Sequence, residues 1–212
     1  LCLAAGGGRQ GPIYAAAGGI VTVVDISSEM LNLDRDVARQ RNLEIRVVEQ
    51  SMDDLSCFEP ASFDIVIQPV STCYIPNIEN VYCQVARVME PDGIYISQHK
   101  QPTSLQVEND AAAVYRLGTH YYRSEPLTPA RTASLVREAG TYEYIHRWQE
   151  LIGGMCRAGF VIEDLTEPLH ADGAAEPGSF GHRSNFVAPY VRIKARRTCQ
   201  VVEVPGIWTP DR

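Results

Sequence analysis

The clearest chemical signal in the sequence is a glycine-rich stretch near its start, Gly6-x-Gly8-x-x-Gly11. It follows a short apolar run and precedes a helical pattern, and such a turn points backbone N–H groups at a ligand that can lie directly on the bare glycines. Asp25 ends the next apolar run, 17 residues beyond Gly8. A carboxylate at that place can accept both hydroxyls of a ribose. The pattern predicts a site for an adenosine-containing ligand rather than a purely structural turn.

The elements that must position these residues alternate between β-rich runs and helical patterns in the first half of the chain. This alternation indicates βαβ units and a parallel sheet. The spacing predicts strands at 1–5, 20–25, 44–49, 63–69, 94–98, 160–165 and 189–196.

Helices are expected between these strands. Ser27 is a plausible N-cap for the first long helix, whose Met30, Leu33 and Val37 share one face. Asn77 is expected to cap the second, and Pro91-Asp92-Gly93 to turn the chain into the strand at 94–98. The apolar stripe of that second helix consists of Ile78, Val81, Val85 and Val88, and a further helix begins near His146 and ends at Gly159.

Three blocks of sequence favour one ligand over the other adenosine compounds. Residues 2–31 resemble the first motif of the class I S-adenosylmethionine-dependent methyltransferases, in a small-molecule branch similar to methyltransferase type 11. "SMDDLSCFEPASFDIVI" resembles the acidic loop after the third strand and the fourth strand of that family, and "VARVMEPDGIYIS" resembles its next helix, turn and fifth strand. The resemblance covers residues 1–100 well and 145–196 more weakly. It implies a Rossmann-like, doubly wound, mostly parallel α/β sheet of seven strands, helices on both faces and a final antiparallel strand at 189–196.

The same resemblance implies S-adenosyl-L-methionine as the cofactor and assigns roles by position. The backbone of the glycine loop would contact its methionine part, Asp25 would hold the ribose, and Pro69 and Val70 would flank the sulfonium. The chain has Ser51 where the family often has an acid for the adenine amino group, and Ser51 or Asp53 could take that role. The implied cofactor-binding residues are Ala5, Gly6, Gly8, Asp25, Ile26, Ser51, Met52, Asp53, Pro69 and Val70.

Candidates for the catalytic groups follow the fourth and fifth strands, where a methyl acceptor must approach the sulfonium. In-line methyl transfer needs a general base only when the nucleophile carries a proton that it must lose. Tyr74 could wall the pocket or bind an acceptor, although loop packing is an equal alternative. His99 is the best-placed candidate base, with a hydrogen-bonded histidine at a strand end as its alternative. His146 could line the acceptor pocket, but packing against the fifth strand is the preferred interpretation.

The segment at 103–144 has no clear period and is rich in tyrosine, which predicts a lid or cap inserted into a single domain of residues 1–212. Packing of an irregular cap explains the same aromatic residues. The adjacent Gly153 and Gly154 cost helix stability, so they suggest a close backbone approach, with the cofactor region as a candidate neighbour. The tail at 198–212 is expected to be irregular.

Composition limits the partners. The chain has 212 residues and a net charge of −7, which argues against nucleic-acid binding, and the basic stretch at 192–197 is interpreted as the solvated face of a strand. No apolar run is long enough to span a bilayer, so we expect a cytoplasmic protein, monomeric or homodimeric, that acts on a small-molecule acceptor. Its six scattered cysteines suggest mostly buried, reduced thiols and no metal site. Leu1 already lies within the first predicted strand, which suggests that residues precede it.

Two other functions use the same glycine loop. One is an NAD(P)-dependent oxidoreductase, whose weakness is the missing Tyr-x-x-x-Lys pattern after the central strands. The other is a methyltransferase-like domain that binds a cofactor or a partner without catalysis. Methyl transfer to a small molecule is the leading hypothesis.

Overall fold

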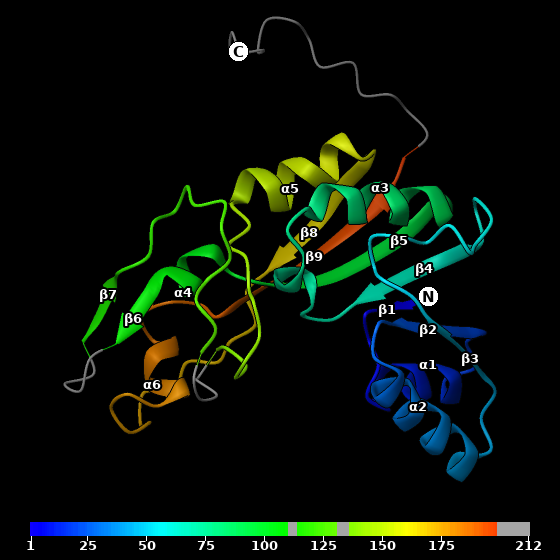
Figure 1. The fold of residues 1–212 in the computed structure, drawn as a ribbon, viewed down its shortest axis with the longest axis horizontal. Coiled ribbons are helices and arrows are strands. Elements are labelled where there is room, and N and C mark those ends of the chain that lie inside the picture. The colour runs from blue at the N-terminus through cyan, green and yellow to red at the C-terminus, as the bar shows by residue number, and fades with distance from the viewer. Residues whose placement is uncertain (110–113, 131–135, 199–212) are drawn as a thin grey trace, which may run out of the picture.

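A seven-stranded β-sheet forms the centre of the computed structural model (Figure 1), which describes residues 1–109, 114–130 and 136–198. The strands follow the order β3-β2-β1-β4-β5-β9-β8. Strand β9 is antiparallel to both neighbours, and the other neighbouring pairs are parallel. The strands are β1 (Cys2–Leu3), β2 (Val21–Asp25), β3 (Ile45–Glu49), β4 (Phe63–Gln68), β5 (Met89–Lys100), β8 (Phe160–Thr166) and β9 (Tyr190–Arg197). The predicted fold class and the final antiparallel strand are confirmed.

Burial explains the sequence patterns of these strands. Val24 of β2 is inaccessible to solvent, as expected for a central strand that is covered on both faces. In β9 the side chains of Val191, Ile193 and Ala195 are buried, while the basic residues between them remain accessible. The basic stretch at 192–197 therefore belongs to the outer face of a strand, as predicted.

Helices cover both faces of the sheet (Figure 1). Helices α1 (Gln10–Ala16) and α2 (Ser28–Arg41) lie on one side, and α3 (Ile78–Val88) and α5 (Trp148–Arg157) lie on the other. The main core cluster fills the space between the sheet, α3 and α5, and a smaller cluster joins α2 to β1 and β2. This two-sided packing leaves the carboxyl ends of the parallel strands free to form a site.

Both predicted helix caps are present. Ser27 Oγ accepts a hydrogen bond from Met30 N at 3.2 Å, and Asn77 Oδ1 accepts one from Asn80 N at 3.3 Å. Each bond satisfies a backbone N–H that has no partner within its own helix. The predicted stripe of α3 is buried, at Ile78, Val81, Val85 and Val88.

The buried face of α2 differs from the prediction that grouped Met30, Leu33 and Val37. Met30 and Leu33 are 44% and 47% exposed, whereas Leu31 and Asp34 are fully buried. Met30 and Leu33 instead face the pocket described below. The helical spacing that groups Met30, Leu33 and Val37 was predicted correctly, but their face of α2 lies beside the glycine loop rather than against the sheet.

A cap lies beyond the end of the sheet toward which β4 and β5 run (Figure 1). Its antiparallel pair of strands, β6 and β7, falls within the predicted lid at 103–144. The cap elements are α4 (Pro102–Gln106), β6 (Val107–Asn109), β7 (Tyr115–Leu117) and α6 (Phe180–Ser184), and a short 3-10 helix, η1 (Thr72–Tyr74), follows β4. The division into one domain with a lid stays a prediction, and all but Thr198 of the predicted tail lies outside the described residues.

Several local expectations need correction. The turn expected at 91–93 is an irregularity within β5, because Met89 pairs with Phe63 while Ile94 already pairs with Ile65. The third long helix, α5, begins at Trp148, so His146 precedes it rather than beginning it.

The close approach at the glycine pair involves α3 rather than the cofactor region. A Cβ on Gly154 would lie 3.2 Å from two ring carbons of Tyr82, which belongs to α3. A Cβ on Gly153 would meet the guanidinium end of Arg157.

The expectation of mostly buried cysteines is wrong. Cys2 and Cys73 are buried, but Cys57, Cys83 and Cys156 are exposed, and Cys199 lies outside the described residues. Within the ranges that the structure describes, no three His, Cys, Asp or Glu residues are grouped as a metal site would require, and no helix is long and apolar enough to cross a membrane.

Candidate functional site

A pocket of about 850 Å³ opens at the carboxyl ends of β1, β2, β3 and β4. Its walls come from the segments that follow those four strands and from Glu138 of the predicted lid. Of the ten residues predicted to bind the cofactor, all except Gly8 line it, namely Ala5, Gly6, Asp25, Ile26, Ser51, Met52, Asp53, Pro69 and Val70. The fold therefore brings together residues that are as much as 65 positions apart in the sequence.

The glycine loop forms one wall of this pocket. Gly6 N donates to Asp25 Oδ2 at 2.9 Å. A Cβ on Gly6 would lie 2.8 Å from Met30 Cβ and 3.0 Å from Asp25 Cγ, so no larger residue fits without displacing one of them. Position 6 thus carries no side chain because Met30 and Asp25 already fill the space that a Cβ would occupy.

Asp25 presents a half-buried carboxylate at the end of β2. Its Oδ2 accepts from Gly6 N, and its Oδ1 accepts from Ser27 N, both at 2.9 Å. A carboxylate oxygen has two acceptor sites, so each oxygen keeps one for a ligand in the pocket. Two such oxygens match the spacing of neighbouring hydroxyls on a ribose.

Asp34 anchors the loop from behind, a role that the sequence analysis missed. Its Oδ2 accepts from Gly7 N at 2.9 Å and from Gly8 N at 3.1 Å, and the residue is fully buried. Burial raises the pKa of Asp34, and Oδ1 has no hydrogen-bond partner among the described residues. Gly8 is therefore held away from the pocket, with a positive φ of 71°. The sequence did carry a signal for this role, because Asp34 is an acidic residue on the face of α2 that its helical pattern predicts to be apolar.

The loop after β3 supplies the far end of the pocket. Ser51 Oγ donates to Asp53 Oδ1, so the two polar residues that could replace the family's acid already contact each other. Ile26 is 72% exposed beside them, an apolar surface that a planar ring would cover. Met52 is fixed through its sulfur, which accepts from Gln68 Nε2 at 3.3 Å.

The wall after β4 rests on a buried polar network. Tyr95 donates its hydroxyl hydrogen to Gln68 Oε1, and Gln68 Nε2 also donates to Ser71 Oγ at 3.1 Å. Ser71 Oγ in turn donates to Pro69 O at 3.0 Å. Gln68 and Tyr95 do not line the pocket themselves, but they fix Met52, Pro69 and Ser71, which do.

His99 and His146 lie behind this wall and do not line the pocket. His99 is fully buried, with Nδ1 2.8 Å from Thr72 Oγ1 and Nε2 2.8 Å from Ser97 Oγ. Burial lowers the pKa of His99 to about 3, so the ring is neutral and both nitrogens are engaged. His146 donates from Nε2 to Thr72 O at 2.9 Å, and burial lowers its pKa as well. For His99, the alternative of a hydrogen-bonded histidine describes this geometry better than a base. His146 does not line the acceptor pocket, and its Nε2 hydrogen bond goes to Thr72 of η1.

Tyr74 does line the pocket. Burial is the main cause that raises its pKa, and the ammonium of Lys100 lies 5.5 Å from the centre of its ring. Its phenol therefore stays protonated at neutral pH and can donate a hydrogen bond.

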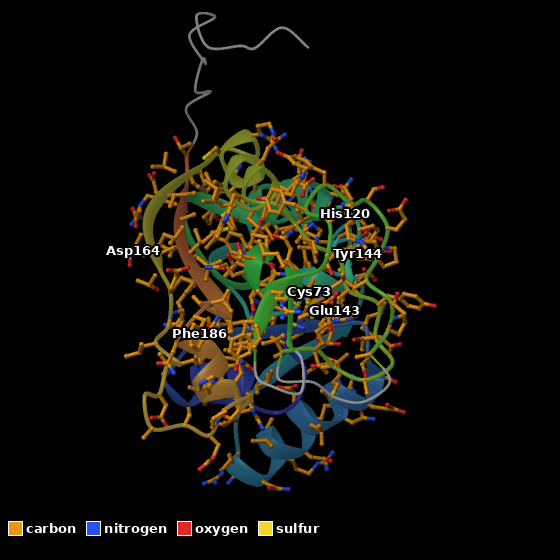
Figure 2. All side chains as sticks on the ribbon, turned by 90° about the vertical axis from the view of Figure 1, so that its left-hand side faces the viewer. Cys73, His120, Glu143, Tyr144, Asp164 and Phe186 are labelled. Atoms are coloured by element: carbon orange, nitrogen blue, oxygen red, sulfur yellow. The ribbon has the colours of Figure 1, made fainter. Side chains whose placement is uncertain are left out.

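A buried ion pair fastens the predicted lid to this wall. Lys100 Nζ, at the end of β5, lies 2.8 Å from Glu143 Oε2, and both side chains are buried. The next lid residue, Tyr144, donates its backbone N–H to Cys73 O in η1 at 2.7 Å. Figure 2, which looks onto the cap end of the molecule, shows Cys73 and Glu143 close together near its centre. The pair fixes the backbone of residues 138–144 at the pocket, which no periodicity in the sequence could have indicated.

The pocket suits a ligand with an adenosine at one end. Its volume of about 850 Å³ lies within the common range for ligand sites. The bare Gly6 edge, the free acceptor sites of Asp25 and the exposed Ile26 provide a backbone cradle, a sugar contact and an apolar ring contact within one cavity.

Comparisons with known proteins point the same way. A family model described as a methyltransferase domain matches residues 1–97. The chain is 36% identical over 171 residues to the uncharacterized methyltransferase YbaJ of Bacillus subtilis, covering 79% of this chain and 67% of that protein. It spans only 28% to 59% of the next curated relatives.

Solved structures share the fold. An S-adenosylmethionine-dependent methyltransferase from Mesorhizobium loti has a TM-score of 0.73 at 20% identity, with 92% of this chain and 89% of that chain covered. Geranyl diphosphate C-methyltransferase from Streptomyces coelicolor A3(2), solved with S-adenosyl-L-homocysteine, has a TM-score of 0.66 at 14% identity, with 93% and 71% covered.

Proposed function

Because this chain belongs to the class I S-adenosylmethionine-dependent methyltransferase superfamily and takes S-adenosylmethionine as its cofactor, we propose that it methylates a small-molecule acceptor. The observation that carries the proposal is a single cavity that runs from Asp25 to Tyr74 and is bordered by Glu138 of the lid segment. The net charge of −7 further favours a small acceptor over nucleic acid.

In this proposal the cofactor lies along the residues that line the pocket. The backbone of Ala5 and Gly6 faces its methionine part, and Arg9 offers a cation for the carboxylate of that part. Asp25 accepts from the two ribose hydroxyls, and Ile26 covers one face of the adenine. These roles rest on the free acceptor sites and exposed surfaces described above.

The remaining parts of the cofactor to be assigned residues are the other end of the adenine and the sulfonium. Met52 offers its backbone N–H to the adenine ring, with Ser51 or Asp53 for the amino group. Pro69 and Val70 flank the sulfonium. When bound, S-adenosylmethionine supplies a methyl group that its sulfonium charge already activates for in-line displacement.

The chain's own residues then orient the acceptor and exclude water. Tyr74 keeps its proton and donates a hydrogen bond to whatever occupies the β4 end of the pocket. The neutral His99 and His146 hold η1 in place through Thr72, so in this proposal they position Tyr74 rather than move a proton. The lid covers the acceptor and lowers the local water content, which strengthens each of these contacts.

Product formation tests the proposal. The purified chain is titrated with S-adenosylhomocysteine and, separately, with NADH, and is then assayed for S-adenosylhomocysteine release with a panel of small phenols, alcohols, amines, thiols and carboxylic acids. We expect binding of S-adenosylhomocysteine and turnover of at least one acceptor. Binding without turnover across the panel would indicate a silent binding domain, and preference for NADH would indicate an oxidoreductase.

A further inference from the structure

The end of the pocket beside β4 carries two titratable side chains in the part of the chain that the structure describes, Tyr74 and Glu138. Of the other charged lining residues, Arg9 follows β1, Asp25 ends β2 and Asp53 follows β3. Glu138 comes from the lid segment and is exposed to solvent, so its carboxylate is accessible to a ligand. An acceptor that enters beside Tyr74 therefore meets one carboxylate.

Tyr74 and Glu138 differ in what they can do with a proton. Burial above all, and then nearby acidic groups that include Glu138, raise the pKa of Tyr74. The phenol consequently keeps its proton and does not serve as a base, which leaves the carboxylate of Glu138 at this end of the pocket. A carboxylate oxygen accepts hydrogen bonds, so Glu138 can receive a proton donor from the pocket.

The buried ion pair sets the position of Glu138. Glu138 N donates to Glu143 Oε1 at 3.3 Å, and Glu138 O accepts from Thr141 Oγ1 at 3.1 Å. Glu143 is held in turn by Lys100, 2.8 Å away at the end of β5. The backbone of Glu138 is thus tied to the sheet through one buried carboxylate, while its side chain stays accessible.

We propose that Glu138 is the general base of the reaction and that the acceptor carries its nucleophile as a hydroxyl or amine that still bears a proton. This inference rests on the proposed function. The acceptor's oxygen or nitrogen forms a bond to the methyl carbon, and the carbon–sulfur bond breaks with its electron pair remaining on sulfur. The proton of the acceptor passes to a carboxylate oxygen of Glu138, which later releases it to water.

Calorimetry tests the placement of Glu138 without any acceptor. A carboxylate beside the sulfonium favours the cationic cofactor over the neutral S-adenosylhomocysteine, so Glu138→Gln should lower the ratio of the two affinities about threefold to tenfold. Its affinity for S-adenosylhomocysteine should stay within about twofold, which also shows that the variant is folded. Glu125→Gln, the same change at an exposed lid residue outside this pocket, is the matched control and should leave the ratio unchanged.

Turnover of the acceptor found in the panel tests the role of Glu138 in proton transfer. Glu138→Gln should lower kcat about 100-fold to 10,000-fold, as expected for loss of a general base, with little change in the KM of the acceptor. An unchanged affinity ratio, or an unchanged kcat, would overturn this inference. By contrast, wild-type protein that binds S-adenosylhomocysteine but turns over no member of the panel would contradict the proposed function alone, and the affinity ratio would still decide where Glu138 lies. Wild-type protein that fails to bind S-adenosylhomocysteine would contradict the proposed function and this inference together.

Discussion

Replacing Asp25 with alanine should weaken cofactor binding strongly. The carboxylate has one acceptor site left on each oxygen, because Gly6 N and Ser27 N occupy the others. Asp25→Ala would remove two hydrogen bonds from the ribose to a charged group, each with a net value of about 1.5–3 kcal/mol. Water that refills the space recovers part of this loss.

A net loss of about 2–4 kcal/mol corresponds to a Kd for S-adenosylhomocysteine that is roughly 30- to 1000-fold weaker. Isothermal titration calorimetry of wild type and variant measures it directly. The matched control is Glu49→Ala, because Glu49 is the register partner of Asp25 at the end of β3, is exposed and does not line the pocket. The control should bind within about twofold of wild type. An Asp25→Ala variant with wild-type affinity would refute the ribose assignment.

Three further changes probe the scaffold of the site. Asp34→Asn should raise the free energy of unfolding at pH 7, because burial raises the pKa of Asp34 and its negative charge therefore costs stability as the pH rises. The gain in free energy of unfolding should be smaller in acid. A free energy of unfolding below that of the wild type, measured by urea denaturation at pH 7, would contradict this. Gly153→Ala should stabilise α5 by about 0.5–1 kcal/mol. Gly154→Ala should stabilise it less, or destabilise it, because the new Cβ meets the Tyr82 ring. A higher unfolding temperature for Gly154→Ala than for Gly153→Ala would contradict this packing. The pKa of His99 is about 3, far below that of the unfolded chain, so its contribution to stability falls as pH drops below about 6.5, by at most about 1.4 kcal/mol per pH unit. His99→Gln should flatten the acid side of the curve of unfolding free energy against pH, and an unchanged slope would contradict the buried neutral ring.

The sheet and its caps could be predicted because their signals are local. Val-rich runs, the spacing from the glycine loop to Asp25, and the capping side chains of Ser27 and Asn77 act over a few residues or one βαβ unit. The cofactor-lining residues follow strand ends, and the carboxyl ends of parallel strands meet at one edge, so the order of the strands was enough to bring them together.

The remainder depended on contacts between distant segments. His99 was predicted to follow the strand at 94–98, as a pocket residue would, but it lies within β5, and the sequence could not reveal that Thr72 and Ser97 engage both its ring nitrogens. Glu138 lies in a segment without periodicity, and its position depends on the buried pair of Lys100 with Glu143. Pairings such as Thr72 with His99, 27 residues apart, and Lys100 with Glu143, 43 residues apart, leave no spacing to recognise.

A crystal structure of the chain with S-adenosylhomocysteine tests the central claim most directly. We predict that the ligand lies in the pocket of about 850 Å³, with both ribose hydroxyls within hydrogen-bond distance of the two Asp25 oxygens and its sulfur at the end nearer Tyr74. Density for the ligand outside this pocket, or a ribose that does not touch Asp25, would contradict the account.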